Sequence, residues 1–174
     1  MLLDNCVTVK INGIRMIFIL TVKDCGIIVK VPMRSSKAKA CRFQLPETVN
    51  VKGFNTRLGA CRGCVYLSHL TTAGCLSVWK YNYSEVDDMW VLLRRIDISR
   101  RLEEVTADDR VSNLGFHEDA LIVYISIKSL IFSYCVADDT LNLIVELNAE
   151  DSHRFWIVLE NPWVSYLLLH SWGL

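Results

Sequence analysis

The stretch Leu58-Gly59-Ala60-Cys61-Arg62-Gly63-Cys64-Val65-Tyr66 has a weaker second copy further along the chain. Its Leu-Gly pair returns as Leu114-Gly115 and its Cys-Val-Tyr triplet as Ile122-Val123-Tyr124, with two more residues between them. Two further segments with strand-like patterns follow each copy. Self-similarity at a period of roughly 20–50 residues is typical of repeat folds, including propellers built from four-stranded blades. The repeat therefore predicts propeller blades.

Most of the chain alternates apolar and polar residues with the two-residue period of a β-strand. Asn12-Gly13 separates two such runs, which indicates a hairpin, and residues 24–26 are expected to form a turn. Only residues 97–110 have helical spacing, because Ile98, Leu102 and Val105 fall on one face. The expected strands are residues 6–11, 14–22, 27–31, 41–45, 64–70, 76–81, 90–98, 120–127, 130–136 and 141–147.

No linker rich in Pro, Gly or Ser divides the chain, so residues 1–174 are expected to form one domain. Many short strands at regular spacing with almost no helix are typical of a sandwich, barrel or propeller, and the repeat favours the propeller. We predict an all-β, antiparallel, propeller-like fold. It would be a partial propeller, of about three to four blades or an open arc.

Composition limits the partners. Lys and Arg number 19, as do Asp and Glu, so the net charge is zero and gives no bulk attraction to nucleic acid. The longest uncharged apolar run near the N-terminus, residues 16–22, is well short of the roughly twenty residues of a membrane-spanning helix. Neither a nucleic acid nor a membrane is therefore expected as a partner.

Seven cysteines are an odd number in a chain without the pattern of a small secreted scaffold. We expect reduced thiols that pack as small hydrophobic side chains, in a protein of the cytoplasm or nucleus. As an alternative, Cys61, Cys64, His69 and Cys75 approach the spacing of a zinc knuckle, which would make the chain a small nucleic-acid binder. On a strand, however, Cys64 and His69 would point to opposite faces.

Catalytic patterns are absent from the sequence. It contains no nucleophile elbow, phosphate-binding loop, dinucleotide fingerprint or zinc-protease motif. His117 lies beside Glu118 and Asp119, an arrangement that is more common in an exposed turn than in a catalytic site. We predict a protein that is not an enzyme, with no catalytic residues, no metal site and no cofactor.

Several short motifs follow one another along roughly residues 40–150. They are Phe43-Gln44-Leu45-Pro46, Leu58-Gly59 with Gly63, Leu76-Ser77-Val78-Trp79, Trp90-Val91-Leu92 with Ile96, Leu114-Gly115-Phe116-His117 and Val123-Tyr124. In order and spacing these motifs resemble those of plant F-box-associated domains. The resemblance implies a propeller-like domain that binds the target protein in an SCF-type ubiquitin ligase.

The sequence departs from that family in two ways. Residues 1–31 have strand patterns and no Leu-Pro-rich helical F-box, so contact with the Skp adaptor is not implied. Glu118 stands where the family often has proline. The expected function is therefore a protein-binding module whose target and binding residues are unknown. A non-functional fragment of a larger protein is the other alternative.

Tryptophans are the candidate anchors for a partner. Trp79 and Trp90 flank one hairpin loop and are expected either in a blade core or, for one of them, on an exposed binding face. Trp156, Trp163 and Trp172 either close the last blade or form an exposed patch.

Overall fold

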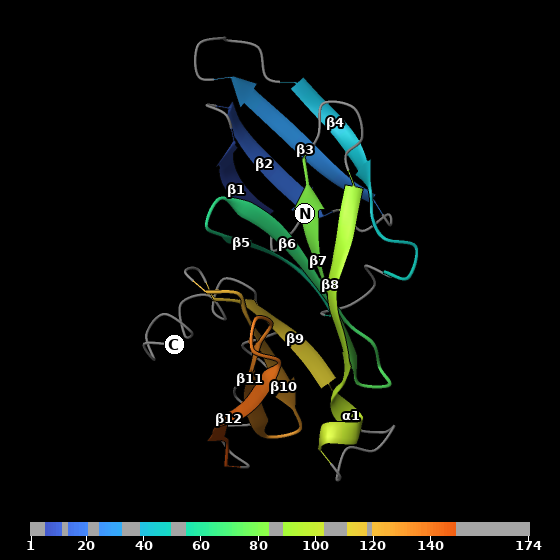
Figure 1. Cartoon of the computed structure of the whole chain (residues 1–174), viewed down its shortest axis with the longest axis vertical. Coiled ribbons are helices and arrows are strands. Elements are labelled where there is room, and N and C mark those ends of the chain that lie inside the picture. Colours follow the sequence, from blue (N-terminus) through green and yellow to red (C-terminus); the bar gives the residue numbers. More distant parts are fainter. Residues whose placement is uncertain are drawn as a thin grey trace.

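The computed structural model describes residues 6–11, 14–20, 25–32, 39–49, 55–83, 89–102, 111–117 and 120–148. These residues form three antiparallel sheets, each made of four strands that are consecutive in the sequence (Figure 1). This confirms the prediction of an all-β, propeller-like fold built from four-stranded blades. We name the sheets blade 1 (β1–β4), blade 2 (β5–β8) and blade 3 (β9–β12).

The twelve described strands and one short helix follow one another without a crossover. In blade 1 the strands are β1 (Cys6–Ile11), β2 (Ile14–Leu20), β3 (Cys25–Pro32) and β4 (Lys39–Gln44). In blade 2 they are β5 (Thr56–Cys61), β6 (Cys64–Leu70), β7 (Cys75–Asn82) and β8 (Met89–Asp97), followed by α1 (Ile98–Arg101). In blade 3 they are β9 (Val111–Phe116), β10 (Ile122–Ile127), β11 (Leu130–Cys135) and β12 (Thr140–Glu146).

The blades lie one after another in an open arc, with blade 1 at the top of Figure 1 and blade 3 at the bottom. The first strands of neighbouring blades lie side by side, β1 beside β5 and β5 beside β9. The fourth strand of each blade is its outer edge. This is the arrangement of a partial propeller, in which apolar faces of neighbouring sheets cover one another.

Blades 1 and 2 share a core of buried apolar side chains. Phe18, from blade 1, is completely buried and its ring meets the edge of Tyr81 in blade 2 at 5.0 Å between centroids. Phe43 and Trp90 extend this aromatic cluster, and the Trp90 indole Nε1 donates a hydrogen bond to the Gln44 carbonyl. Edge-to-face aromatic packing of this kind adds to the hydrophobic contribution of the buried area.

Blades 2 and 3 share a second core, and polar contacts join them as well. The Arg94 guanidinium of β8 donates to the Val136 carbonyl, and Arg101 of α1 forms an ion pair with Asp139 at 2.8 Å. Asp139 also accepts a hydrogen bond from the hydroxyl of Tyr134, whose pKa burial raises to about 12. The Tyr134 hydroxyl therefore remains a donor at any physiological pH.

The internal repeat of the sequence has a counterpart in strand register. Gly59 lies opposite Tyr66 in the β5–β6 pair, and Gly115 lies opposite Tyr124 in the β9–β10 pair. In both blades the tyrosine belongs to a buried run, Val65 to Ser68 in β6 and Val123 to Ser126 in β10. Gly59 and Gly115, Tyr66 and Tyr124, and Ser68 and Ser126 are thus equivalent positions of blades 2 and 3.

Some predicted elements differ from the structure. Two strands were not predicted, β5 and β9, because each contains the glycine of a Leu-Gly pair and glycine is unfavourable in strands. The turn expected at residues 24–26 is wrong for Cys25 and Gly26, which begin β3 in register with β2 and β4. Ladder hydrogen bonds to two neighbours outweigh the local turn preference of that segment.

The predicted helix is confirmed over one turn only. α1 begins after Asp97, whose side chain accepts a hydrogen bond from the Arg100 backbone N–H as an N-cap, and ends at Arg101. Residues 103–110 of the prediction lie outside the described residues, as do Asn12-Gly13 and the three C-terminal tryptophans. No helix in the described parts of the chain is long and apolar enough to span a membrane.

Candidate protein-binding site

The outer strand of blade 2 carries three exposed apolar side chains. Met89 is 57% exposed, Leu92 50% and Val91 41%. Among the residues whose side chains are described, only Leu143 is another large apolar side chain of comparable exposure. We call Met89, Val91 and Leu92 the β8 patch. Clustered exposed apolar side chains are typical of surfaces that bind other proteins.

The β8 patch belongs to both faces of the sheet. Leu92 lies opposite Trp79, whose side chain packs in the core with blade 1, whereas Val91 lies opposite Lys80 on the alternate face. A flat partner surface would cover only one face. An extended peptide added along the outer edge of β8 would reach both, because its own side chains alternate in the same way.

Basic side chains continue the strand beyond the patch. After Leu93, Arg94 and Arg95 are exposed, and Arg100 in α1, which forms a 3.2 Å ion pair with Asp97, has a side chain that is 87% exposed. The first half of β8 is therefore apolar, and its second half contains two arginines and Asp97. A segment with apolar residues at one end and acidic residues at the end beside the arginines would match these side chains.

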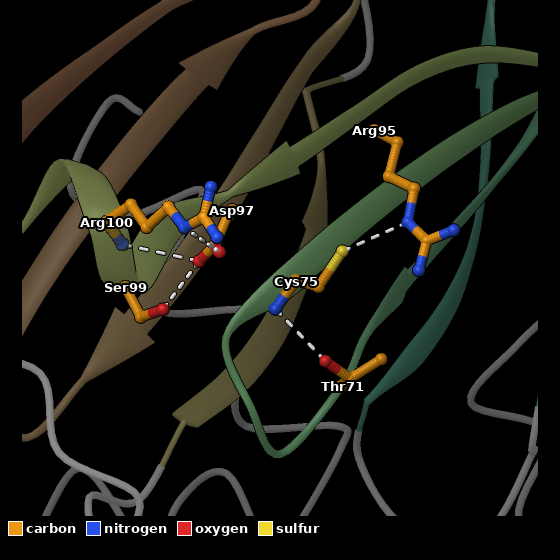
Figure 2. A network of polar contacts seen from close by, with 6 residues as sticks. All are labelled: Thr71, Cys75, Arg95, Asp97, Ser99 and Arg100. Atoms are coloured by element: carbon orange, nitrogen blue, oxygen red, sulfur yellow. Dashed lines mark hydrogen bonds and ion pairs between the residues drawn. The ribbon is translucent and has the colours of Figure 1, made fainter.

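Local contacts hold the basic end of β8 in place (Figure 2). The Arg95 Nε donates to the Cys75 sulfur at 3.3 Å, and this hydrogen bond raises the pKa of the guanidinium. Hydrogen bonding from the Ser99 hydroxyl lowers the pKa of Asp97, with smaller effects of the Arg100 backbone N–H and guanidinium. These hydrogen bonds hold the Asp97 carboxylate in place at the start of α1. The Arg95 side chain is held in turn by its contact with Cys75 through Nε.

Blade 3 has an equivalent of Leu92. Leu143 of β12 is 56% exposed and lies opposite the buried Phe132, as Leu92 lies opposite the buried Trp79. Leu143 does not belong to a patch, because its neighbour Asn142 is polar and its neighbour Ile144 is half-buried. The pair Leu92 and Leu143 therefore provides a matched comparison for mutagenesis.

The two tryptophans predicted as candidate anchors are part of the blade core rather than of the exposed patch. Trp79 is 6% exposed and packs between blades 1 and 2. Trp90 is half-buried against Phe43 and Tyr81. The β8 patch itself was not predicted. The signal that indicates it is the unbroken apolar run from Met89 to Leu93, which departs from strand alternation.

The four candidate zinc ligands do not come together. Cys61 and Cys64 are partners at one end of the β5–β6 hairpin, whereas His69 lies near the other end of β6, roughly 17 Å away at about 3.4 Å per residue. Cys75 contacts Arg95. No cluster of three potential ligands occurs among the described residues, and the six cysteines whose side chains are described are all free thiols.

His69 has a structural role that makes stability depend on pH. Its Nδ1 shares a 2.8 Å hydrogen bond with the Thr56 hydroxyl, and burial lowers its pKa. The unfolded chain then binds a proton more readily than the native chain, so stability is lost as the pH falls from about 6.5 through the lower native pKa.

We expect His69→Asn to remove that part of the pH dependence, because the amide keeps a hydrogen-bonding group near Nδ1 and does not titrate. The measurement is the melting temperature of both proteins at pH 7.5 and pH 5.5. The fall between the two pH values should be smaller in the variant. An equal fall in both proteins would contradict this role of His69.

The remaining candidate groups for chemistry are dispersed. His117 follows β9 and lies 6.4 Å from the ring of Tyr124, while Glu118 and Asp119 lie outside the described residues. Cys135 donates to Asp138 in the turn before β12. Among the described residues, the β8 patch is therefore the candidate binding surface.

No family model matches the chain, and no curated protein matches it.

Proposed function

We propose that the chain is a protein-binding module, comparable to the substrate-recognition domain of F-box proteins in SCF-type ubiquitin ligases. Two observations support the proposal. Motifs that resemble those of plant F-box-associated domains occur in the same order along residues 40–150. Blade 2, which contains several of these motifs, ends in an outer strand, β8, with three exposed apolar side chains. The exposed β8 patch is the observation that carries the proposal.

The partner is an extended segment of another protein that adds to the edge of β8. Its apolar side chains would cover Met89, Val91 and Leu92, and its acidic side chains would meet Arg95 and Arg100. Strand addition draws affinity from main-chain hydrogen bonds and specificity from alternate side chains. The charge match would add specificity and association rate.

The test uses peptides selected from a random library against the folded full chain. Selected sequences should contain apolar residues in alternation, with Asp or Glu at the end that lies beside Arg95 when the peptide pairs with β8. Leu92→Asp should weaken their binding about tenfold or more, since it places a charge inside the apolar contact. The melting temperature should change little, because substitutions of exposed side chains usually alter stability by less than about 0.5 kcal/mol.

Leu143→Asp is the matched control, because Leu143 has a similar exposure and the same position relative to a buried aromatic residue. Its peptide affinity should equal that of the unmodified chain. Equal loss in both variants, or no loss in Leu92→Asp, would contradict binding at β8. Failure to select any peptide would contradict a peptide-binding module.

A further inference from the structure

Two cysteines lie directly opposite each other at the closed end of the β5–β6 hairpin. Cys61 is the last residue of β5, Cys64 is the first residue of β6, and the two are partners in the strand register. Directly opposite residues of an antiparallel pair share one face of the sheet, with Cα atoms about 4.5–5.5 Å apart. That spacing falls within the range that a disulfide bond requires.

The turn between the two cysteines fixes this arrangement before any bond forms. It consists of Arg62 and Gly63, whose φ angles of 49° and 74° are both positive. Two consecutive positive φ angles are typical of the type I′ turn, whose twist matches that of the strands it joins. The two thiols are therefore already held together by the ladder and the turn, so a bond between them orders little further chain.

No other cysteine of the described strands lies opposite a second cysteine. The strand partners are Ile19 for Cys6, Gln44 for Cys25, Ile28 for Cys41, Asp97 for Cys75, and Ile122 and Thr140 for Cys135. The register of the described strands thus brings one pair of thiols face to face.

The two thiols of this pair differ in exposure, which separates their roles. Cys64 is half-buried, whereas Cys61 is only 5% exposed. A reagent in solution therefore reaches Cys64 first. Cys61 lies beside it as a second nucleophile that the reagent itself does not reach.

Two neighbours of Cys64 suit a reaction with an anionic reagent. Tyr66 lies two residues further along β6, on the same face of the sheet. Burial, followed by electrostatic and hydrogen-bond interactions with Cys64, raises the pKa of Tyr66 to about 12, so its hydroxyl remains a proton donor at physiological pH. Arg62 is exposed in the turn and places a positive charge beside the pair, which attracts anions.

We propose that Cys61 and Cys64 are a reversible thiol-modification site whose substrate is an anionic low-molecular-weight disulfide, of the class of oxidised glutathione. The Cys64 thiolate attacks one sulfur of the reagent, whose S–S bond breaks to release one thiolate and leave a mixed disulfide on Cys64. The Cys61 thiolate then attacks the Cys64 sulfur, and the second reagent thiolate leaves. The two protein thiols lose two protons and two electrons, which convert the reagent disulfide into two thiols.

The bond between Cys61 and Cys64 is expected to be easily reduced. It closes a loop of only four residues, and short loops gain little stability from a disulfide. Its Cys64 sulfur remains open to an attacking thiol, and accessible disulfides are the labile ones. The reaction is independent of peptide binding at β8.

The test is incubation of the reduced full chain with oxidised glutathione, then alkylation of the remaining thiols and trypsin digestion without reduction. Cleavage after Arg62 separates the two cysteines, so their bond should join peptide 58–62 to peptide 63–80, with Cys75 alkylated. Excess reduced glutathione should restore both thiols. The absence of this link, a link from either peptide to another cysteine, or a stable mixed disulfide in the unmodified chain would overturn the proposal.

Single variants separate the two roles. Cys61→Ser should keep a mixed disulfide with one glutathione at Cys64, because the second thiol is missing. In Cys64→Ser, the buried Cys61 should react with oxidised glutathione about tenfold or more slowly than Cys64 does in Cys61→Ser. Equal rates would contradict Cys64 as the first nucleophile.

Cys135→Ser is the matched control for these variants. Cys135 is half-buried, as Cys64 is, but has no cysteine as a strand partner. This variant should form the bond between Cys61 and Cys64 at the rate of the unmodified chain. Loss of that bond in Cys135→Ser would contradict a reaction confined to the β5–β6 hairpin.

Discussion

Replacing Gly59 by alanine is expected to lower the free energy of unfolding by about 1–3 kcal/mol, the usual range for overpacking a core. The added methyl group would lie 2.3 Å from the Phe116 ring, far closer than non-bonded carbon atoms approach one another in proteins. Blades 2 and 3 would therefore have to separate locally. Urea denaturation of both proteins, monitored by tryptophan fluorescence, gives the difference.

Phe116→Ala provides the control for this cause. On its own it should destabilise, since the Phe116 ring packs against Tyr66. In the double variant, the alanine at position 59 no longer meets a ring, so the combined loss should be clearly smaller than the sum of the two single losses. Simple additivity would mean that Gly59 is required for a reason other than the approach of Phe116.

The second large effect is expected at Asn113, which is completely buried between blades 2 and 3. Its Nδ2 donates to the Ser68 hydroxyl at 2.7 Å and to the Ser68 carbonyl at 3.2 Å. Asn113→Ala leaves these acceptors in an apolar interior without that donor. We expect a loss of about 2 kcal/mol in the free energy of unfolding, within the range for an unsatisfied buried polar group.

Asn142 of β12 is the matched control, because it is the same residue type in the same blade and is exposed. Asn142→Ala should change the free energy of unfolding by less than about 0.5 kcal/mol. If Asn113→Ala were equally harmless in urea denaturation, the hydrogen bonds to Ser68 would not contribute to joining the blades.

The blade repeat could be predicted from the sequence because it depends on local patterns. Strand alternation located ten of the twelve described strands, and Lys128-Ser129 forms the turn that its residues favour. β5 and β9 were missed for a reason that involves distant residues. Gly59 looks unfavourable in an isolated strand, and only the position of Phe116, far along the chain, explains why glycine belongs there.

The candidate binding strand could be predicted less well. Tryptophan enrichment at interfaces suggested Trp79 and Trp90, but both side chains are used in packing blade 1 on blade 2. Which residues of an apolar run remain exposed depends on whether a further strand or blade covers them. The order of strands in the sheet decides this exposure. The side chains of β8 remain exposed because β8 is the last strand of its sheet.

The central claim is that the chain binds an extended protein segment along β8. Its most direct test is amide hydrogen exchange of the full chain with and without a bound peptide from the library selection. Slower exchange should be concentrated in Met89–Asp97, with β12 unchanged, since an added strand protects the amides with which it pairs. Protection confined to other strands, with exchange in Met89–Asp97 unaltered, would contradict the claim.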